Sequence, residues 1–419
     1  MSNTTAELRA EGGVDEGTGD RMSPRLRLVY FVHDLGDPAV SRRLLMLRPF
    51  LVSAVVIGFH RAAMAPAEVA GWPAVALGRT KDGRLGLRML SVLRIHAMIS
   101  RFQTYLRGAT VIMARQLEML MLAAAGRRRY AETSTLIYEC LDIHRLMVAP
   151  SLIGTALRRL ESRLLLETDG LVVSSPAFSR EHLRPIHGES LPPVCLIENK
   201  VLQAELACPS AVKPRPTGPP WHIGWYGVLR CRRSLEILAD LTRKLPGQII
   251  VELRGRPAIS AIPDFDALVA AAPDIRFLGR YDRRHDLGEI YQSVHFSWAV
   301  DFFEAGMNSR WLLPNRLYEG GLHGAVPIAL SSVETGHWLA EHGAGVLLDE
   351  PVPRDLYRYF SALSPSTYAK LAAALAALPR DAWVDQGADG TRLATALHRR
   401  RKPPAAVRLL DDRAPALRQ

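Results

Sequence analysis

Short apolar runs alternate along the chain with longer segments in which apolar residues recur at helical spacing. The first five runs are typical of buried strands and cover residues 25–32, 53–59, 109–115, 134–142 and 169–175. Helical patterns lie between them, for example over residues 40–51 and 151–167. Strands that alternate with helices predict βαβ units with right-handed crossovers, and therefore a parallel sheet.

A second series of the same kind starts after a proline-rich stretch. Residues 204–220 hold five prolines, which is typical of a linker. The apolar runs of the second series cover residues 221–229, 249–255, 275–281, 295–300, 325–330 and 343–348. We therefore expect a first domain over 25–203 and a second over 221–365, followed by helices and a basic tail over 366–419. Residues 1–24 are polar, acidic and glycine-rich, and we expect them to be disordered.

The chain length supports a division into two domains, and the net charge indicates which classes of partner suit the protein. A chain of 419 residues is too long for one ordinary core, so two domains are expected. The formal net charge of +11 comes mainly from arginine, which suits nucleic acid, an anionic membrane or a phosphate-bearing substrate. We expect no nucleic-acid partner, because the arginines are not interleaved with aromatic residues.

The cysteines and the hydropathy pattern indicate the cellular compartment in which the protein is expected. Four scattered cysteines without CxxC pairs predict neither a disulfide framework nor a metal site. No segment has the pattern of a signal peptide, and no run of about 18 uncharged apolar residues predicts a spanning helix. These features predict a cytoplasmic protein, or one that lies on the inner face of a membrane.

The turn after the first apolar run of the second series carries a basic cluster. In "YGVLRCRRSLEIL", residues 226–238, Gly227 allows a tight turn, and Arg230 and Arg233 lie at or near a helix start. Guanidinium groups beside the free N–H groups of a helix start are suited to bind a diphosphate. The alternative is a solvated basic helix start without a ligand.

A second polar cluster lies in "LPNRLYEGGLHGAVPIA", residues 313–329. Asn315, Arg316 and Glu319 come just before the buried run at 325–330. The Glu319 carboxylate could accept two hydrogen bonds from a ribose diol. Alternatively, it could interact only with the dipole of its own helix.

In their order along the chain, these segments resemble the donor-binding domain of GT-B fold glycosyltransferases, especially the retaining group with an E-x7-E motif. The resemblance covers about residues 25–355 and implies an α/β fold with two Rossmann-like, doubly wound domains that face each other across a cleft. It implies a nucleoside diphosphate sugar donor, with UDP favoured. It also implies no cofactor, because basic side chains and a helix start can neutralise the leaving diphosphate without a metal.

The match in the basic turn is partial. Gly227 matches the glycine of the family's G-R-x-x-x-x-K element, and Arg233 falls where the lysine is expected. Val228 stands in place of the usual arginine, with Arg230 as its substitute.

The match in the second cluster is also partial. Glu319 falls on the second glutamate of E-x7-E, which holds the ribose in the family, but the position of the first glutamate holds Trp311. Asn315 and Arg316 are similar to variants in which a Pro-Asn-Arg/Lys element precedes the ribose glutamate. The missing glutamate leaves the sugar and the anomeric outcome open.

Polar residues also end two strands of the first domain. In "FVHDLGDPAVSRR", His33, Asp34 and Gly36 stand where the family has its acceptor and phosphate loop. In "IYECLDIHRL", Asp142 and His144 resemble the family's V-x-D-x-H-D strand end, so Asp142 and His144 are candidate catalytic residues. The alternatives are a turn or helix cap for the aspartates and a structural role for the histidines.

Residues 81–108 form a basic segment with no acidic residue after Asp82. Among apolar residues it carries Arg84, Arg88, Arg94, Arg101 and Arg107. An amphipathic helix of this kind suits an anionic membrane surface, and the basic tail at 398–402 adds to it. The alternative is a core helix of the first domain with its arginines in water.

The function expected from these patterns is transfer of a sugar from a nucleoside diphosphate donor to a lipid-linked saccharide of exopolysaccharide or a similar glycan, by an enzyme on the inner membrane surface. One alternative is a GT-B enzyme on a soluble substrate, such as a nucleotide-sugar epimerase, which would not need the basic segment. Another is a non-catalytic binding module on the same fold, which would tolerate loss of Arg233 and Glu319.

Overall fold

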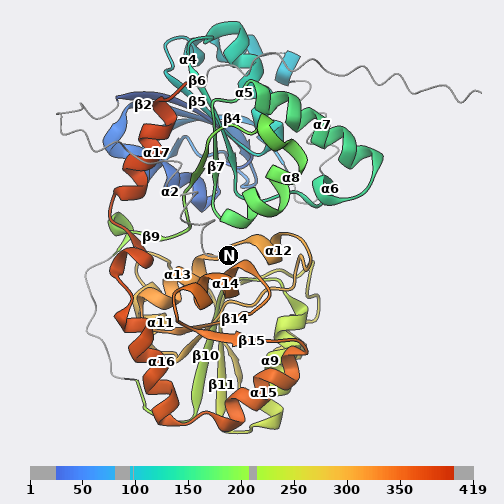
Figure 1. The fold of residues 1–419 in the computed structure, drawn as a ribbon, viewed down its shortest axis with the longest axis vertical. Helices are drawn as coiled ribbons and strands as arrows, with labels where there is room; N and C mark the ends of the chain where they lie inside the picture. The colour runs from blue at the N-terminus through green and yellow to red at the C-terminus, as the bar shows by residue number, and fades with distance from the viewer. Residues whose placement is uncertain (1–24, 81–94, 98, 207–214, 401–419) are drawn as a thin grey trace, which may run out of the picture.

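The computed structural model describes residues 25–80, 95–97, 99–206 and 215–400. They form two α/β domains stacked along the long axis of the molecule (Figure 1). The segment predicted to be disordered, residues 1–24, lies outside the described residues. So do residues 81–94 of the basic segment, residues 207–214 of the linker and the chain after residue 400.

In the first domain, the described residues form an eight-stranded sheet of order β3-β4-β2-β1-β5-β6-β7-β8, parallel except for the pair β3 and β4. Its strands are β1 (Leu26–Val32), β2 (Leu51–His60), β3 (Glu68–Val69), β4 (Trp72–Arg79), β5 (Val111–Arg115), β6 (Thr135–Cys140), β7 (Gly170–Val173) and β8 (Val194–Leu196). The strand order reverses between β1 and β5, which is where doubly wound sheets bind ligands.

In the second domain, six parallel strands have the order β12-β11-β10-β13-β14-β15. They are β10 (Trp221–Leu229), β11 (Ile249–Pro257), β12 (Ile275–Phe277), β13 (Phe296–Trp298), β14 (Val326–Leu330) and β15 (Val346–Leu348). Here the order reverses between β10 and β13. Both sheets therefore have the doubly wound arrangement that the sequence predicted.

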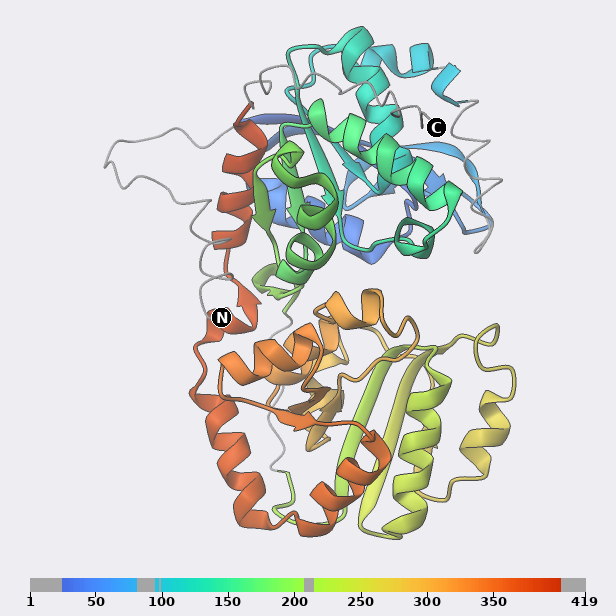
Figure 2. The same ribbon diagram turned by 45° about the vertical axis from the view of Figure 1, so that its right-hand side comes forward.

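Helices cover both faces of each sheet (Figure 2). In the first domain they are α2 (Pro38–Leu47), α4 (Gln103–Leu106), α5 (Leu117–Tyr130), α6 (Arg145–Val148), α7 (Leu152–Leu166) and α8 (Arg184–His187). In the second they are α9 (Arg232–Lys244), α10 (Phe265–Ala270), α11 (Leu287–Gln292), α12 (Asn308–Trp311), α13 (Asn315–Leu322), α14 (Glu334–Glu341), α15 (Val352–Ala362) and α16 (Pro365–Ala377). Alternate residues of β1 enter two different cores: Val29 and Phe31 enter one, and Leu28 and Tyr30 the other. A strand buried on both faces reads as a continuous apolar run, which explains why the sequence showed it clearly.

The C-terminal part of the chain returns to the first domain. The short strand β16 (Val384–Asp385) pairs with β9 (Val201–Leu202), and α17 (Ala388–His398) then packs against α2 and β8. Gly390 allows this contact, because a Cβ there would lie 2.9 Å from the carbonyl oxygen of Met46. The two domains are thus joined by two chain crossings.

The described part of the basic segment, which ends in α4, contributes to the core. Its apolar side chains are buried among those of the first domain: Ile95, Ile99, Phe102 and Leu106. Arg101 and Arg107 are exposed. The apolar face of this part is therefore covered by protein. Among the described residues, no helix combines the length and apolar character needed to cross a membrane.

Candidate active site

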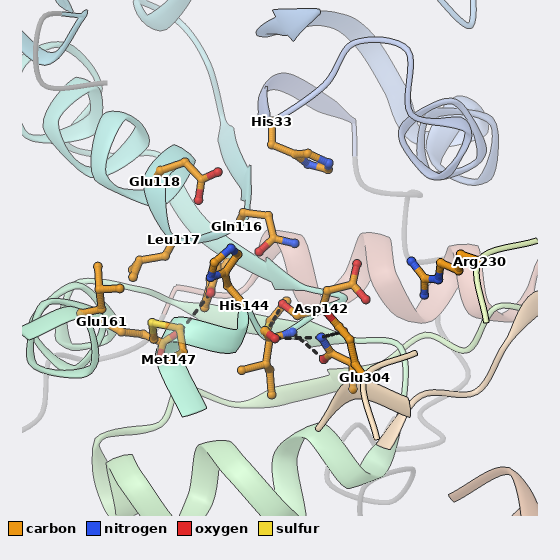
Figure 3. Close-up of a pocket in the computed structure, with 15 residues that line it drawn as sticks. His33, Gln116, Leu117, Glu118, Asp142, His144, Met147, Glu161, Arg230 and Glu304 are labelled. Atoms are coloured by element: carbon orange, nitrogen blue, oxygen red, sulfur yellow. Dashed lines mark hydrogen bonds between the residues drawn. The ribbon is translucent and has the colours of Figure 1, made fainter. Parts of the chain in front are cut away.

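A cavity lies between the two domains, at the carboxyl ends of their central strands (Figure 3). The first domain contributes most of its wall: His33, Gln116, Leu117, Glu118, Tyr138, Cys140, Asp142, Ile143, His144, Met147, Leu157 and Glu161. The second domain contributes Arg230, Glu304 and Asn308. The cavity therefore joins the loop after β1 to the loop after β10, and so the switch-point edges of the two sheets.

The loop that carries Asp142 is held by the second domain. The Asn308 side-chain amide donates to the carbonyl oxygen of Ile143 at 2.8 Å, and its oxygen accepts from the Ile143 N–H at 2.9 Å. The same amide donates to Glu304 at 2.7 Å. Paired hydrogen bonds of this kind fix the loop backbone, and with it the position of Asp142 relative to the second domain.

Asp142 has a raised pKa. Loss of contact with water raises the pKa of its carboxyl to about 6; Arg230 opposes this rise, while Glu304 and Asp37 add to it. The side chain also faces the open cleft, so water there moderates the rise. Figure 3 shows the Asp142 carboxyl and the Arg230 guanidinium directed toward the same part of the cavity. A carboxyl of this kind is ionised at neutral pH and is basic enough to accept a proton from a hydroxyl group.

His144 begins α6. Its Nδ1 accepts a hydrogen bond from the Leu146 N–H at 3.2 Å, which caps the helix. In the neutral ring this places the hydrogen on Nε2, so the nitrogen that is not used by the cap is a donor. His144 lines the cavity as predicted, with a geometry suited to donate a hydrogen bond rather than to remove a proton.

Of the residues predicted in the loop after β1, one lines the cavity and two shape the turn. His33 lines the cavity, with its Nε2 3.8 Å from Asp37. Asp34 accepts a hydrogen bond from the Gly36 N–H at 3.0 Å and forms an ion pair with Arg61 at 3.0 Å. Asp34 and Gly36 therefore shape the turn, and only His33 of the three is among the residues that line the cavity.

Gln116, which the sequence analysis did not single out, also marks the switch point. It lies between β5 and α5 with φ 77°, a left-handed conformation that is uncommon for a residue other than glycine. Its side chain lines the cavity. Strained backbone of this kind often lies at binding sites.

A buried ion cluster lies beneath the loops after β1 and β5. Glu139 accepts from Arg115 at 2.7 Å, from Arg43 at 2.7 Å and from the Tyr30 hydroxyl. Arg115 also reaches Asp37, the N-cap residue of α2, at 3.0 Å. Burial alone would raise the pKa of Glu139, but the two arginines and these hydrogen bonds lower it to about 2. The cluster holds both loops in place below the cavity.

A second hydrogen-bonded chain leads away from the deep end of the cavity. Glu161 of α7 accepts from the Tyr138 hydroxyl at 3.0 Å, and its other oxygen lies 2.9 Å from Nε2 of His187. Nδ1 of His187 lies 2.8 Å from the Ser162 hydroxyl. These contacts fix the orientation of the Glu161 carboxyl in the cavity wall.

At the second sheet, the strand ends are shaped by glycine. Gly227 has φ 111° and Gly255 has φ 123° on adjacent strands. A Cβ on Gly255 would lie 2.0 Å from the carbonyl oxygen of Gly227. The sequence pointed to Gly227 for its conformational freedom, and the backbone conformation agrees with that reasoning.

Two predicted arginines meet at one aspartate beside this turn. Arg230 lies 3.6 Å and Arg316 3.8 Å from Asp301, which is on the loop after β13. Arg316 is in the first turn of α13, whose free N–H groups add positive potential. Two guanidinium groups with a single carboxylate leave a net positive charge at the switch point of the second sheet.

Arg233 lies apart from this pair. It donates to the two oxygens of Glu350 at 2.9 and 3.1 Å and lies over the ring of Phe302 at 4.0 Å. About half of its side chain is exposed. Arg233 lies beside a second hollow, which also includes Arg310 and Ser309, rather than among the residues that line the main cavity.

Glu319 is buried and already paired. Its Oε1 accepts from Arg283 at 2.8 Å, and the Tyr291 hydroxyl lies 3.5 Å from its Oε2. Arg283 also binds Glu205, which forms an ion pair with Arg42 of the first domain at 3.3 Å. The chain of charges therefore extends from α13 to α2. Asn315 joins the same contact by accepting from Arg42 at 3.3 Å.

No protein-family model matches the chain. The succinoglycan biosynthesis protein ExoL of Rhizobium meliloti (strain 1021) is 43% identical over 363 residues, which cover 86% of this chain and 90% of that protein. The chain belongs to the ExoL family.

Several solved structures share the fold of this chain. HepE from Anabaena, in complex with UDP and glucose, superposes with a TM-score of 0.63 at 15% identity, covering 89% of this chain and 99% of HepE. Sucrose-phosphate synthase from Thermosynechococcus elongatus has a TM-score of 0.64 at 14% identity, covering 89% and 95%. The glycosyltransferase WaaG has a TM-score of 0.58 at 12% identity, covering 88% and 99%.

These structures confirm the predicted GT-B fold. The retaining E-x7-E subgroup stays a prediction, because this chain has Trp311 where the motif has its first glutamate. Trp311 is buried in the core of the first domain, and its ring centroid lies 5.7 Å from that of His182. Its carbonyl oxygen accepts from the Ser175 hydroxyl at 2.5 Å. In this member of the family, position 311 joins the two domains.

The sequence analysis missed the two residues that the second domain contributes beside Arg230. Glu304 and Asn308 lie in "DFFEAGMNSRW", directly before the segment 313–329 that contains Glu319. Their signal was a set of polar residues spaced among apolar ones directly after the strand at 295–300. Within the described residues, no group of three or more His, Cys, Asp or Glu side chains is arranged to hold a metal ion.

Proposed function

We propose that this member of the ExoL family transfers a sugar from a UDP-linked donor to a lipid-linked saccharide during exopolysaccharide synthesis. The observation that carries the proposal is the cavity between the switch points of the two sheets, with Asp142 on one side and Arg230 on the other. ExoL is named for succinoglycan biosynthesis, and HepE has been solved with UDP and with UDP-glucose. Both are consistent with this donor and this pathway.

The second domain stabilises the leaving group in this proposal. As the bond between the anomeric carbon and the diphosphate oxygen breaks, its electron pair moves to the diphosphate. Arg230 and Arg316 lie together near Asp301, Arg316 in the first turn of α13, and in this proposal they are in place to receive the diphosphate before the reaction. Charges arranged in advance stabilise a transition state more than charges that must rearrange.

The first domain prepares the acceptor. A hydroxyl of the acceptor forms the new bond to the anomeric carbon and gives its proton to Asp142. His144 donates a hydrogen bond from Nε2 to a sugar oxygen. Glu304 supplies a carboxylate from the second domain to a sugar hydroxyl, near the donor end of the cavity. These roles leave the stereochemical outcome open.

We expect Arg230→Ala to lower turnover about tenfold to a hundredfold, because Arg316 remains to share the charge of the leaving diphosphate. The matched control is Arg232→Ala, since Arg232 pairs with Glu236 and Asp264 instead. UDP release from UDP-glucose would be followed in the presence of membranes that carry lipid-linked saccharides. An equal loss of turnover in the two variants would show that Arg230 does not act at the donor site.

We expect Glu319→Ala to weaken UDP binding by about 1.5–3 kcal/mol, the range of charge-assisted hydrogen bonds, if its carboxylate binds the ribose diol. The structure adds a condition, because Glu319 is paired with Arg283 and the ribose must share that carboxylate. Calorimetry with UDP and GDP measures the effect. Unchanged affinity for both nucleotides would show that Glu319 does not bind the ribose and serves only in its ion pair with Arg283.

A further inference from the structure

The bend between α6 and α7 exposes two large apolar side chains next to each other. Leu152 is 91% and Ile153 is 63% exposed, at the start of α7. Single exposed apolar residues are common on proteins, but adjacent ones at the tip of a helical hairpin indicate contact with an apolar partner. Figure 1 shows α6 and α7 at the side of the first domain.

The bend is a fixed structure. A Cβ on Gly154 would lie 2.5 Å from the carbonyl oxygen of Ala149, so only glycine allows the two helices to pack this closely. Arg158 donates to the carbonyl oxygens of Met147 at 2.7 Å and Ala149 at 3.2 Å. The Ser151 hydroxyl caps α7 by accepting from the Gly154 N–H at 3.1 Å. The exposed pair is therefore held out from the surface by contacts made behind it.

Behind the tip, the outer face of α7 is basic. At helical spacing from Leu152, the exposed positions are Ala156, Arg159, Arg163 and Leu166, and Arg145 is exposed on α6. No acidic side chain lies among these positions. An apolar tip followed by arginines has the charge and polarity order of a bilayer surface, with acyl chains below anionic phosphates.

We propose that the α6–α7 elbow, residues 145–166, docks on an anionic lipid bilayer. Leu152 and Ile153 enter the boundary between headgroups and acyl chains, while Arg145, Arg159 and Arg163 bind lipid phosphates. Each arginine contributes about fivefold to the binding constant near such a surface. Basic segment 81–108 was the first candidate for this contact, but the apolar face of its described part is buried in the core.

Because the elbow also lines the cavity, docking would bring the cavity close to the bilayer. Met147 of α6 and Leu157 of α7 line the cavity from the side opposite their exposed neighbours. A docked elbow therefore holds one wall of the cavity next to the bilayer, where a lipid-linked saccharide has its sugar at the headgroup level. This delivery role rests on the proposed function; the docking surface itself does not.

Flotation with purified full-length protein tests the docking. The vesicles contain phosphatidylcholine with or without phosphatidylglycerol. We expect wild type to float with the anionic vesicles at low salt, and the Leu152→Ser/Ile153→Ser double variant to bind about tenfold or more weakly. The matched control is Met64→Ser, since Met64 is also exposed (83%) but lies on the loop after β2. Arg159→Glu/Arg163→Glu should lower binding to anionic vesicles and make the remaining binding less dependent on salt.

Wild type that fails to float with anionic vesicles would overturn the proposal, as would a double variant that floats like wild type. Calorimetric binding of UDP by the double variant provides the second readout. Loss of vesicle binding with unchanged UDP binding supports the elbow. Failure of the proposed function would be seen separately, as absence of UDP binding in every protein, including wild type.

Discussion

Asp142→Asn should lower turnover by about a hundredfold or more, because amide nitrogen cannot accept the proton of the acceptor hydroxyl. The substitution keeps the size of the side chain and leaves the hydrogen bonds between Asn308 and Ile143 in place, so the loop should keep its position. Binding of UDP should be unchanged, since Asp142 lies on the first domain. The measurement is turnover with UDP-glucose and membrane acceptor, together with calorimetry of UDP.

The pH dependence gives an independent check. Asp142 acts as a base only when ionised, so activity should rise with pH through about 6, the raised pKa of this carboxyl. The Asn variant should lack this rise. Arg230→Ala should move the rise to higher pH, because Arg230 lowers the pKa of Asp142. An Asn variant with near-wild-type turnover, or with the same acid limb, would contradict the role of base and leave Asp142 as a turn residue.

Glu139→Ala should lower the free energy of unfolding by about 3–5 kcal/mol, since it leaves a buried arginine without its main partner. Arg115 is 1% exposed and Glu139 is 0% exposed, so neither charge can recover water. The matched control is Glu167→Ala, which removes an exposed pair with Arg128 and should cost about 1 kcal/mol or less. Urea unfolding at neutral pH compares the two variants. Equal losses would show that the buried cluster adds no special stability.

Acid titration of the wild type tests the same cluster. The pKa of Glu139 is lowered from 4.5 to about 2 in the folded protein. A carboxyl with a lowered folded-state pKa stabilises the fold above its unfolded pKa, and this stability is lost as the pH falls from about 4.5 to 2. The Glu139→Ala variant should lose less stability than wild type over this range.

The fold could be predicted because its central strands are buried on both faces. Runs such as residues 25–32 and 221–229 stand out as continuous apolar segments, and each is a central strand beside a switch point. Strands β3, β8, β9 and β16 were missed, because two or three residues are too few for a pattern to appear. The eight-residue strand β4 was missed as well, because it is only partly buried and contains Pro73 and Gly78. The return of α17 to the first domain was also missed, since its partners lie far away in the chain.

The sequence pointed to candidate residues that follow strand ends. Arg230, Asp142 and His33 come directly after strands, and the parallel topology brings them to one cavity. Arg233 was predicted from its place near a helix start and from motif spacing, and its side chain lies beside Glu350. Glu161 could not be predicted from the sequence, because a carboxylate in the middle of an amphipathic helix is usually solvated. Only the fold places Tyr138 and His187 next to it.

The central claim is that a nucleoside diphosphate binds at the switch point of the second sheet, facing Asp142 across the cleft. The measurement that tests it most directly is a crystal structure of the protein with UDP. We predict a β-phosphate within hydrogen-bond distance of Arg230 or Arg316 and a ribose at Glu319. UDP bound elsewhere, or a cleft that stays without nucleotide at saturating UDP, would contradict it.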